Sequence, residues 1–183
     1  MENLSILGPF NLERVSDKYL LNQNGFNGAG IYFWTIKKND DYYVNYIGIS
    51  SKDMKNRFLG HVKYYLVGKY DIYDQRKLDD LIVQKIYNVQ NNFEIFFNNL
   101  EDNLNQAIKN LRGFSYFFSP IEKEKNILEL IESELITNIN KNESLKHFLS
   151  NYKLSRIKTD TLDLQIEINS QVNIMGIPPQ INL

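Results

Sequence analysis

The stretch AGIYFWTIKKNDDYYVNYIGI, residues 29–49, holds two runs of β-branched and aromatic residues separated by a short polar segment. Runs of this composition, Ala29–Ile36 and Tyr42–Ile49, favour β-strands. The charged and polar residues Lys37–Asp41 between them are typical of a turn. The sequence therefore predicts an antiparallel β-hairpin.

Two tyrosines, Tyr32 and Tyr46, occupy opposite strands of this hairpin. A turn centred on Asn39 places them directly opposite each other and on one face. That arrangement requires a loop of three or five residues or a β-bulge, because an even loop puts the two phenols on opposite faces. They could simply pack together, as two of the 12 tyrosines of the chain. Gly30 and Gly48 near them favour a functional pair, since a glycine in a strand often marks close approach of backbone or ligand.

The composition is that of an ordinary globular protein of 183 residues, with 43% hydrophobic and 23% charged residues. We expect one domain with an elaboration. The absence of cysteine excludes disulfides, zinc–thiolate sites and thiol nucleophiles. The net charge of −1 means that a nucleic-acid partner would need locally concentrated positive charge.

The sequence shows no pattern typical of a targeting or membrane segment. No run of about 18 apolar residues occurs, so we expect no membrane span. The first 25 residues lack the apolar core of a signal peptide. A cytoplasmic protein is the expectation.

The chain divides into an N-terminal helical lead-in over residues 1–27, a core over 28–142 and a C-terminal helix, strand and extended tail over 143–183. Within the core, residues 70–112 or thereabouts form an insertion. Periodicity and capping residues predict helices over 11–22, 53–67, 78–87, 104–111, 126–139 and 145–152. Short strands are expected over 93–97, 114–118 and 163–168.

The predicted helix after the hairpin carries a core stripe and a polar face. The core stripe consists of Met54, Phe58, Val62 and Leu66, which recur every four residues. Arg57, His61 and Tyr64 share a neighbouring face. A guanidinium can grip two phosphate oxygens at once, which suits Arg57 to a phosphodiester.

Positive charge is concentrated around this helix, and a basic patch of this kind suits a phosphate backbone. The alternative is an ordinary solvated helix face. The candidate DNA-binding residues of the patch are Lys52, Lys55, Lys63, Tyr64 and Lys69.

Glu132 lies within the apolar arc of the helix predicted over residues 126–139. On a helical wheel its neighbours in that arc are Leu128, Leu135, Ile136 and Ile139, so the carboxylate is expected to enter the interior. A buried carboxylate is costly unless it is paired or bound to a metal. Two readings follow: a buried salt bridge, for example to Arg57, or a ligand for a divalent cation. Magnesium often takes only one or two protein carboxylates.

Together these residues resemble the GIY-YIG nuclease superfamily over approximately residues 28–142. The shared elements are GIY at 30–32, YIG at 46–48, the Arg57-x-x-x-His61 pair and the Glu132-Ser-Glu-Leu-Ile136 helix. The resemblance implies an α+β fold with a small, about three-stranded antiparallel sheet flanked by helices, an insertion and a C-terminal extension. The final asparagine of the family matches Asn138, Asn140 or Asn142, and Asn140 is preferred.

The resemblance implies a DNA endonuclease that depends on Mg²⁺ or Mn²⁺. Glu132 would hold the metal, and Arg57 would neutralise charge on the phosphate. Tyr32 would orient or deprotonate the attacking water, with Tyr46 and His61 bonded to it, relaying its proton or holding the substrate. A restriction or defence enzyme is expected, and symmetric cleavage of both strands would favour a homodimer. The alternatives are a repair or structure-specific nuclease and a non-catalytic nucleic-acid-binding relative.

Overall fold

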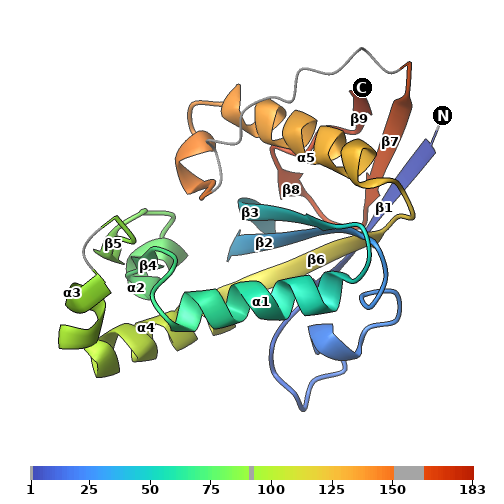
Figure 1. Cartoon of the computed structure of the whole chain (residues 1–183). Coiled ribbons are helices and arrows are strands. Elements are labelled where there is room, and N and C mark those ends of the chain that lie inside the picture. The colour runs from blue at the N-terminus through green and yellow to red at the C-terminus, as the bar shows by residue number, and fades with distance from the viewer. Residues whose placement is uncertain (1, 91–92, 151–162) are drawn as a thin grey trace.

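The computed structural model describes residues 2–90, 93–150 and 163–183 and has mixed helix and strand content (Figure 1). The strands are β1 (Glu2–Phe10), β2 (Gly30–Lys38), β3 (Asp41–Ser50), β4 (Ile72–Tyr73), β5 (Lys85–Tyr87), β6 (Phe114–Pro120), β7 (Gln165–Ser170), β8 (Ile174–Met175) and β9 (Gln180–Asn182). The α-helices are α1 (Met54–Leu66), α2 (Gln75–Asp79), α3 (Phe93–Asn98), α4 (Leu100–Gly113) and α5 (Lys125–Asn140). Two 3₁₀ helices are η1 (Leu20–Asn22) and η2 (Lys146–Phe148).

The main sheet has seven strands in the order β8-β3-β2-β6-β1-β7-β9 and is mixed, so the expected small three-stranded antiparallel sheet is wrong. The hairpin strands and β6 are adjacent and antiparallel as expected. The sheet continues because β1 pairs antiparallel with β6 and parallel with β7. In β1, Leu4 and Ile6 are buried and alternate with polar residues, which is the period of a strand. The N-terminal segment is therefore part of the sheet and no helical lead-in.

Three further expected elements are wrong. Residues 11–22 form turns and the short helix η1 instead of a helix. The helix expected over 78–87 is replaced by α2 and β5, because the Asp74 side chain caps an earlier start and Leu81, with a φ of 62°, breaks the helix. The strand expected over 93–97 is the helix α3, whose Phe96 carbonyl accepts a hydrogen bond from the Asn103 side chain at 3.0 Å.

The end of the chain also differs in part from expectation. Of the helix expected over 145–152, the described residues contain η2, and residues 151–152 lie outside the described ranges. The expected strand over 163–168 is confirmed as β7, which lies inside the sheet between β1 and β9.

The register of the hairpin differs from the predicted one. Asn39 and Asp40 form a two-residue turn, Tyr32 pairs with Gly48, and Tyr46 pairs with Trp34, so the direct opposition of the two tyrosines is wrong. Between the Trp34–Tyr46 and Thr35–Val44 pairs the register shifts by one residue, which leaves Asn45 as the extra residue of a β-bulge. This bulge keeps both tyrosines on one face despite the even turn, and their ring centroids are 6.2 Å apart.

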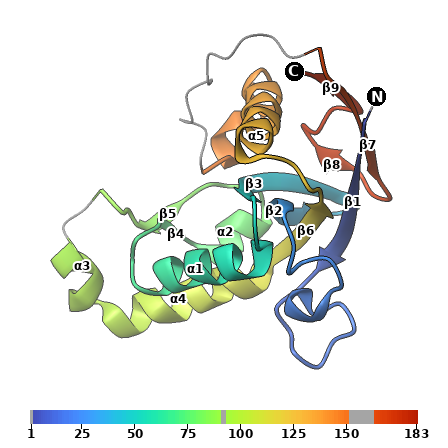
Figure 2. The ribbon, with the colours of Figure 1, turned by 45° about the vertical axis from the view of Figure 1, so that its right-hand side comes forward.

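The sheet separates two hydrophobic cores (Figures 1 and 2). Ile31, Phe33 and Ile47 face the core that includes α5. Tyr32 and Trp34 face the core that includes α1 and α4, and Tyr46 packs against that core. Because neighbouring residues of a strand point to opposite faces, the aromatic side chains of the hairpin are sorted by position.

Gly48 is expected to tolerate no side chain. A Cβ at this position would lie under 3.0 Å from three atoms of the Tyr32 ring, so Gly48→Ala should lower the free energy of unfolding by about 1–3 kcal/mol through overpacking. Gly60→Ala in α1 is the matched control, because its Cβ meets no atom within 4 Å and alanine favours a helix by roughly 0.5–1 kcal/mol. Urea unfolding of both variants tests this, and equal effects would contradict it.

Candidate active site

A cleft of about 500 Å³ lies at the edge of the sheet, where β3 runs between α1 and α5 (Figure 2). In the described chain, β8 covers only the Tyr42 and Tyr43 end of this edge, and the outer side of the remaining part of β3 carries no strand. Residues from two distant stretches of the sequence, 46–57 and 125–132, line the cleft: Tyr46, Ile49, Ser50, Ser51, Lys52, Arg57, Lys125, Glu129 and Glu132. The structure thus brings together the predicted Tyr46, Arg57 and Glu132.

The start of α1 fixes the position of Arg57. The Ser50 side chain accepts a hydrogen bond from the Asp53 backbone N–H at 3.0 Å, and the Asp53 side chain caps the helix by accepting from the Asn56 N–H at 2.9 Å. Arg57 follows one turn later and is exposed. It forms no ion pair within the described residues, so its guanidinium is available to an anion in the cleft.

Glu132 is half-buried at the wall of the cleft, so the expected entry into the interior is only partly met. The core-facing side of α5 is formed by neighbours such as Ile131 and Leu135, and Glu132 lies at its flank, above the sheet edge. Burial, and next the carboxylate of Glu129, raises the pKa of Glu132 to about 7, while Arg57 acts in the opposite direction. The expected alternative of a salt bridge to Arg57 is not formed, and among the described residues Glu132 has no hydrogen bond or ion pair.

Behind the cleft wall, Tyr46 belongs to a chain of hydrogen bonds. Its hydroxyl lies 3.2 Å from Nε2 of His61, and Nδ1 of His61 lies 2.5 Å from the hydroxyl of Tyr70. His61 is buried, and burial together with the positive charge of Arg57 lowers its pKa to about 4. The imidazole is therefore neutral at neutral pH and can accept a proton at one ring nitrogen.

Tyr32 lies behind Tyr46 and does not line the cleft. Its side chain is buried, and its hydroxyl forms no hydrogen bond of good geometry within the described part of the chain, although it lies close enough to the Tyr46 hydroxyl to interact with it. Burial, and next the neighbouring Tyr46, raises the pKa of Tyr32 well above the usual 10. Of the two hairpin tyrosines, Tyr46 and not Tyr32 lines the cleft.

Asn140 is not brought into the cleft. It ends α5 eight residues after Glu132, which corresponds to about 12 Å along the helix. The side chain of Asn138 donates to the Glu134 carbonyl, and that of Asn142 accepts from the Ser144 N–H, so both serve local structure.

The predicted basic patch is divided. Lys52 lines the cleft, whereas Lys55 donates to the Leu21 carbonyl at 2.8 Å and holds the N-terminal loop to α1. At the far end of α1, the Lys69 ammonium lies 4.9 Å from the centroid of the exposed Tyr64 ring. Lys63 is exposed near that end.

The carboxylates of the cleft are the groups that could hold a divalent cation. Across residues 2–90, 93–150 and 163–183, no group of three or more acidic or histidine side chains is close enough to hold a metal by itself. A magnesium ion that keeps several waters needs only one or two carboxylates. Glu132 meets this requirement because no described side chain neutralises it, and Glu129 lies one turn earlier on the same wall. Glu129 also pairs with Lys125 at 2.9 Å.

Sequence reasoning did not find Lys125, Glu129 or Tyr70 as site residues. Glu129 stands three residues before Glu132, a spacing that places two side chains on one helix face and could have been used. Tyr70 follows the end of α1, and only the packing of that loop brings it to His61. No pattern in the sequence indicates this contact.

No family model, curated protein or solved structure matches this chain. The described part of the chain contains no helix that is both long and apolar enough to cross a membrane.

The contribution of His61 to the free energy of unfolding is expected to fall as the pH is lowered from about 6.5 to about 4, whereas the raised pKa of Glu132 acts in the opposite direction over much of this range. In this window His61 is protonated in the unfolded chain, where its pKa is near 6.5, but stays neutral in the folded chain. Proton binding therefore stabilises the unfolded state relative to the folded state. His61→Gln should therefore lose less stability than the wild type as the pH falls through this window. The exposed His147, the second of the 2 histidines, provides the control variant His147→Gln. Urea unfolding across this pH range measures the slopes, and an unchanged slope in His61→Gln would refute the assignment.

Proposed function

We propose that this protein is a divalent-metal-dependent DNA endonuclease related to the GIY-YIG nuclease superfamily. The observation that carries the proposal is the convergence of Tyr46, Arg57 and Glu132 on one cleft. A phenol, a guanidinium and a carboxylate without a partner are the groups needed to orient water, neutralise a phosphate and bind a metal. Lys52 beside them adds positive charge for the DNA backbone.

Each group has a separate task in the hydrolysis. A Mg²⁺ or Mn²⁺ ion held by Glu132, with Glu129 beside it, would act as a Lewis acid on the phosphate and its leaving oxygen. Arg57 binds a non-bridging phosphate oxygen and stabilises the charge that grows there. Arg57 of α1 thus contacts the scissile phosphate directly, whereas the carboxylates of α5 would act on it only through the metal that they hold.

Tyr46 orients the attacking water through its hydroxyl. The neutral His61 accepts the Tyr46 hydroxyl proton at Nε2 when its own ring proton is on Nδ1, where it faces Tyr70. Such a chain lets the hydroxyl oxygen of Tyr46 accept the proton that the water loses as it adds to phosphorus. Tyr32 supports the ring of Tyr46 from behind.

Restriction is the proposed role, with a homodimer as the assembly that would cut both strands. Incubation of purified protein and Mg²⁺ with a large unmethylated DNA tests it, and discrete fragments are the expected result. A preference for branched or damaged DNA would favour a repair nuclease. DNA binding without cleavage in any divalent metal would favour the non-catalytic relative.

Glu132→Gln is expected to lower the rate of plasmid cleavage in Mg²⁺ at least about a hundredfold, since a metal ligand contributes several kcal/mol to the transition state. Glu122→Gln, which alters an exposed carboxylate before α5, should cut like the wild type. EDTA should abolish cleavage by all three proteins. A Glu132→Gln protein that cuts at the wild-type rate would contradict the assignment of Glu132 as the metal ligand.

Tyr46→Phe should lower the cleavage rate by about 10²–10⁴-fold, the range for loss of a positioned proton-transfer group. Tyr32→Phe removes a buried hydroxyl whose only neighbouring polar group is the Tyr46 hydroxyl, so it should change the free energy of unfolding by at most about 1 kcal/mol and cost less than about tenfold in rate. Single-turnover cleavage and urea unfolding measure the two effects. A larger rate loss in Tyr32→Phe would indicate that Tyr32, and not Tyr46, orients the attacking water.

A further inference from the structure

A second cavity, with a volume of about 150 Å³, shares one wall with the cleft. Tyr46 lines both spaces. The wall of the cavity is mainly aromatic and includes Trp34, Tyr65, Tyr70 and Tyr73. The last two come from the segment after α1, inside the insertion that begins near residue 70. A ligand in this cavity would therefore be a neighbour of the group held in the cleft.

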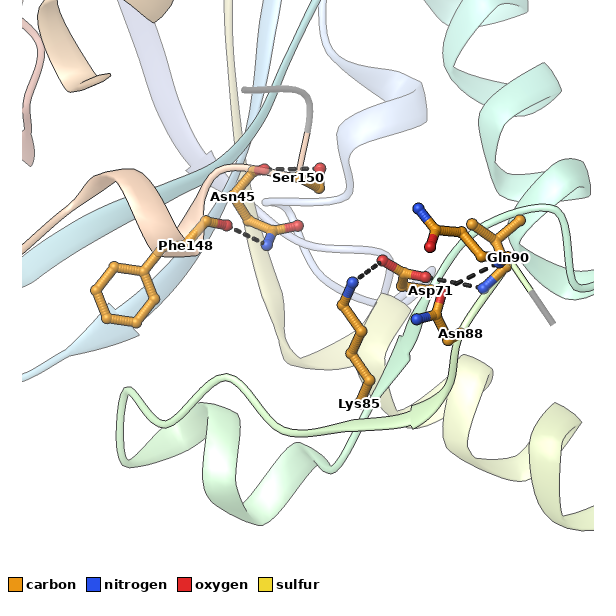
Figure 3. A network of polar contacts seen from close by, with 8 residues as sticks. Asn45, Asp71, Lys85, Asn88, Gln90, Phe148 and Ser150 are labelled. Atoms are coloured by element: carbon orange, nitrogen blue, oxygen red, sulfur yellow. Dashed lines mark hydrogen bonds and ion pairs between the residues drawn. The ribbon is translucent and has the colours of Figure 1, made fainter. Parts of the chain in front are cut away.

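Hydrogen bonds hold the residues on two sides of the cavity opening in place (Figure 3). On one side, the Asn45 side chain donates to the Phe148 carbonyl at 2.7 Å, and the Ser150 hydroxyl donates to the Asn45 carbonyl at 2.8 Å. On the other side, Asp71 accepts from the Val89 N–H at 2.9 Å. These contacts fix the shape of the opening.

The charge at the rim is balanced. Asp71 also pairs with Lys85 at 2.6 Å, so the one carboxylate of the lining is neutralised (Figure 3). The cavity therefore suits a neutral, flat ligand better than an ion.

One buried donor at this cavity lacks a partner. Trp34 is only 4% exposed, and its indole N–H forms no hydrogen bond within the described residues. This nitrogen has almost no accessible surface, so a ligand in the cavity would contact Trp34 through its ring rather than through the N–H.

The size of the cavity selects among flat ligands. A cavity of about 150 Å³ holds a single six-membered aromatic ring such as benzene. A pyrimidine base is a ring of this size with carbonyl acceptors on its edge, and it stacks on aromatic side chains. A purine, with its second ring, is too large.

We propose that this cavity binds one pyrimidine base of the DNA substrate, rotated out of the helix beside the phosphate that is cut. This inference rests on the proposed nuclease function. It identifies the part of the substrate that residues of the inserted segment would contact. The base stacks against the aromatic wall, and its edge meets polar residues of the lining such as Asn45 and Ser150. Enzymes that bind an extruded base combine stacking with edge contacts in this way.

The single tryptophan of the chain allows a direct test, because the indole N–H of Trp34 gives one resonance in a ¹⁵N–¹H spectrum. The protein is titrated in EDTA with thymidine, deoxycytidine, deoxyadenosine and 2-deoxyribose 5-phosphate. Both pyrimidine nucleosides should shift this resonance in a saturable manner. Deoxyadenosine should bind at least about tenfold more weakly, a difference of about 1.4 kcal/mol. The sugar phosphate should leave the resonance unchanged.

Variants at the rim complete the test. Val89 lines the cavity and is 42% exposed, so Val89→Phe should fill the opening and weaken binding at least about tenfold, with a smaller effect for Val89→Leu. Ile82→Phe enlarges an equally exposed side chain away from the cavity and should bind like the wild type. Thermal unfolding checks that each variant is folded.

The outcomes separate this inference from the nuclease proposal. Glu132→Gln should bind pyrimidine nucleosides with unchanged affinity, because it alters only the cleft. Nucleoside binding without any DNA cleavage would support the base pocket and remove the nuclease function. Absence of a saturable shift with either pyrimidine nucleoside, an equal shift with the sugar phosphate, or unaltered binding by folded Val89→Phe would overturn the base pocket.

Discussion

The one-residue insertion at Asn45 in β3 is the constraint on which the rest of the site depends. Side chains alternate between the faces of a strand, so an extra residue reverses the faces of everything that follows it. Val44 points to the α5 side before the bulge, and Tyr46 points to the α1 side after it. With the same two-residue turn and no bulge, Tyr46 would be buried under α5, away from His61. The amide and carbonyl of Asn45 are bonded to Phe148 and Ser150, so the bulge is held by a segment about 100 residues further along the chain.

The residues around this bulge determine the shape and chemistry of the cleft and of the second cavity. The outer edge of β3 carries no strand beyond Tyr43 in the described residues, which leaves α1 and α5 facing each other across open space. Arg57 and Glu132 face the cleft from these helices without forming an ion pair with each other. Behind them, rings such as Trp34 and Phe58 pack edge to face around the tyrosines and hold Tyr46 in place. Charged groups at the rim and rigid aromatic groups behind them are the arrangement from which we propose that the site binds a phosphate and a base.

Local sequence patterns were sufficient for elements whose stability is local. The apolar period of α1 and the β-forming runs of the hairpin were both recognised, as was α5. Local patterns did not predict elements whose conformation depends on contacts outside the element itself. The aromatic run at 93–97 favours a strand in isolation, yet it forms α3 because Phe96 packs against Tyr87 and its carbonyl is bonded by Asn103. The position of β1 inside the sheet follows from pairing with β6 and β7, neither of which is near it in sequence.

The sequence by itself determined which chemical groups this protein carries and on which local elements they lie: two tyrosines on a hairpin, Arg57 and His61 on a helix, and Glu132 on another. Only the tertiary structure decided their neighbours and exposure. It assigned Tyr46 to the cleft and Tyr32 to the interior, left Asn140 outside and added Glu129. The physical reason is that burial, register shifts and side-chain contacts between distant segments are set by the packing of the whole chain, which no local spacing encodes.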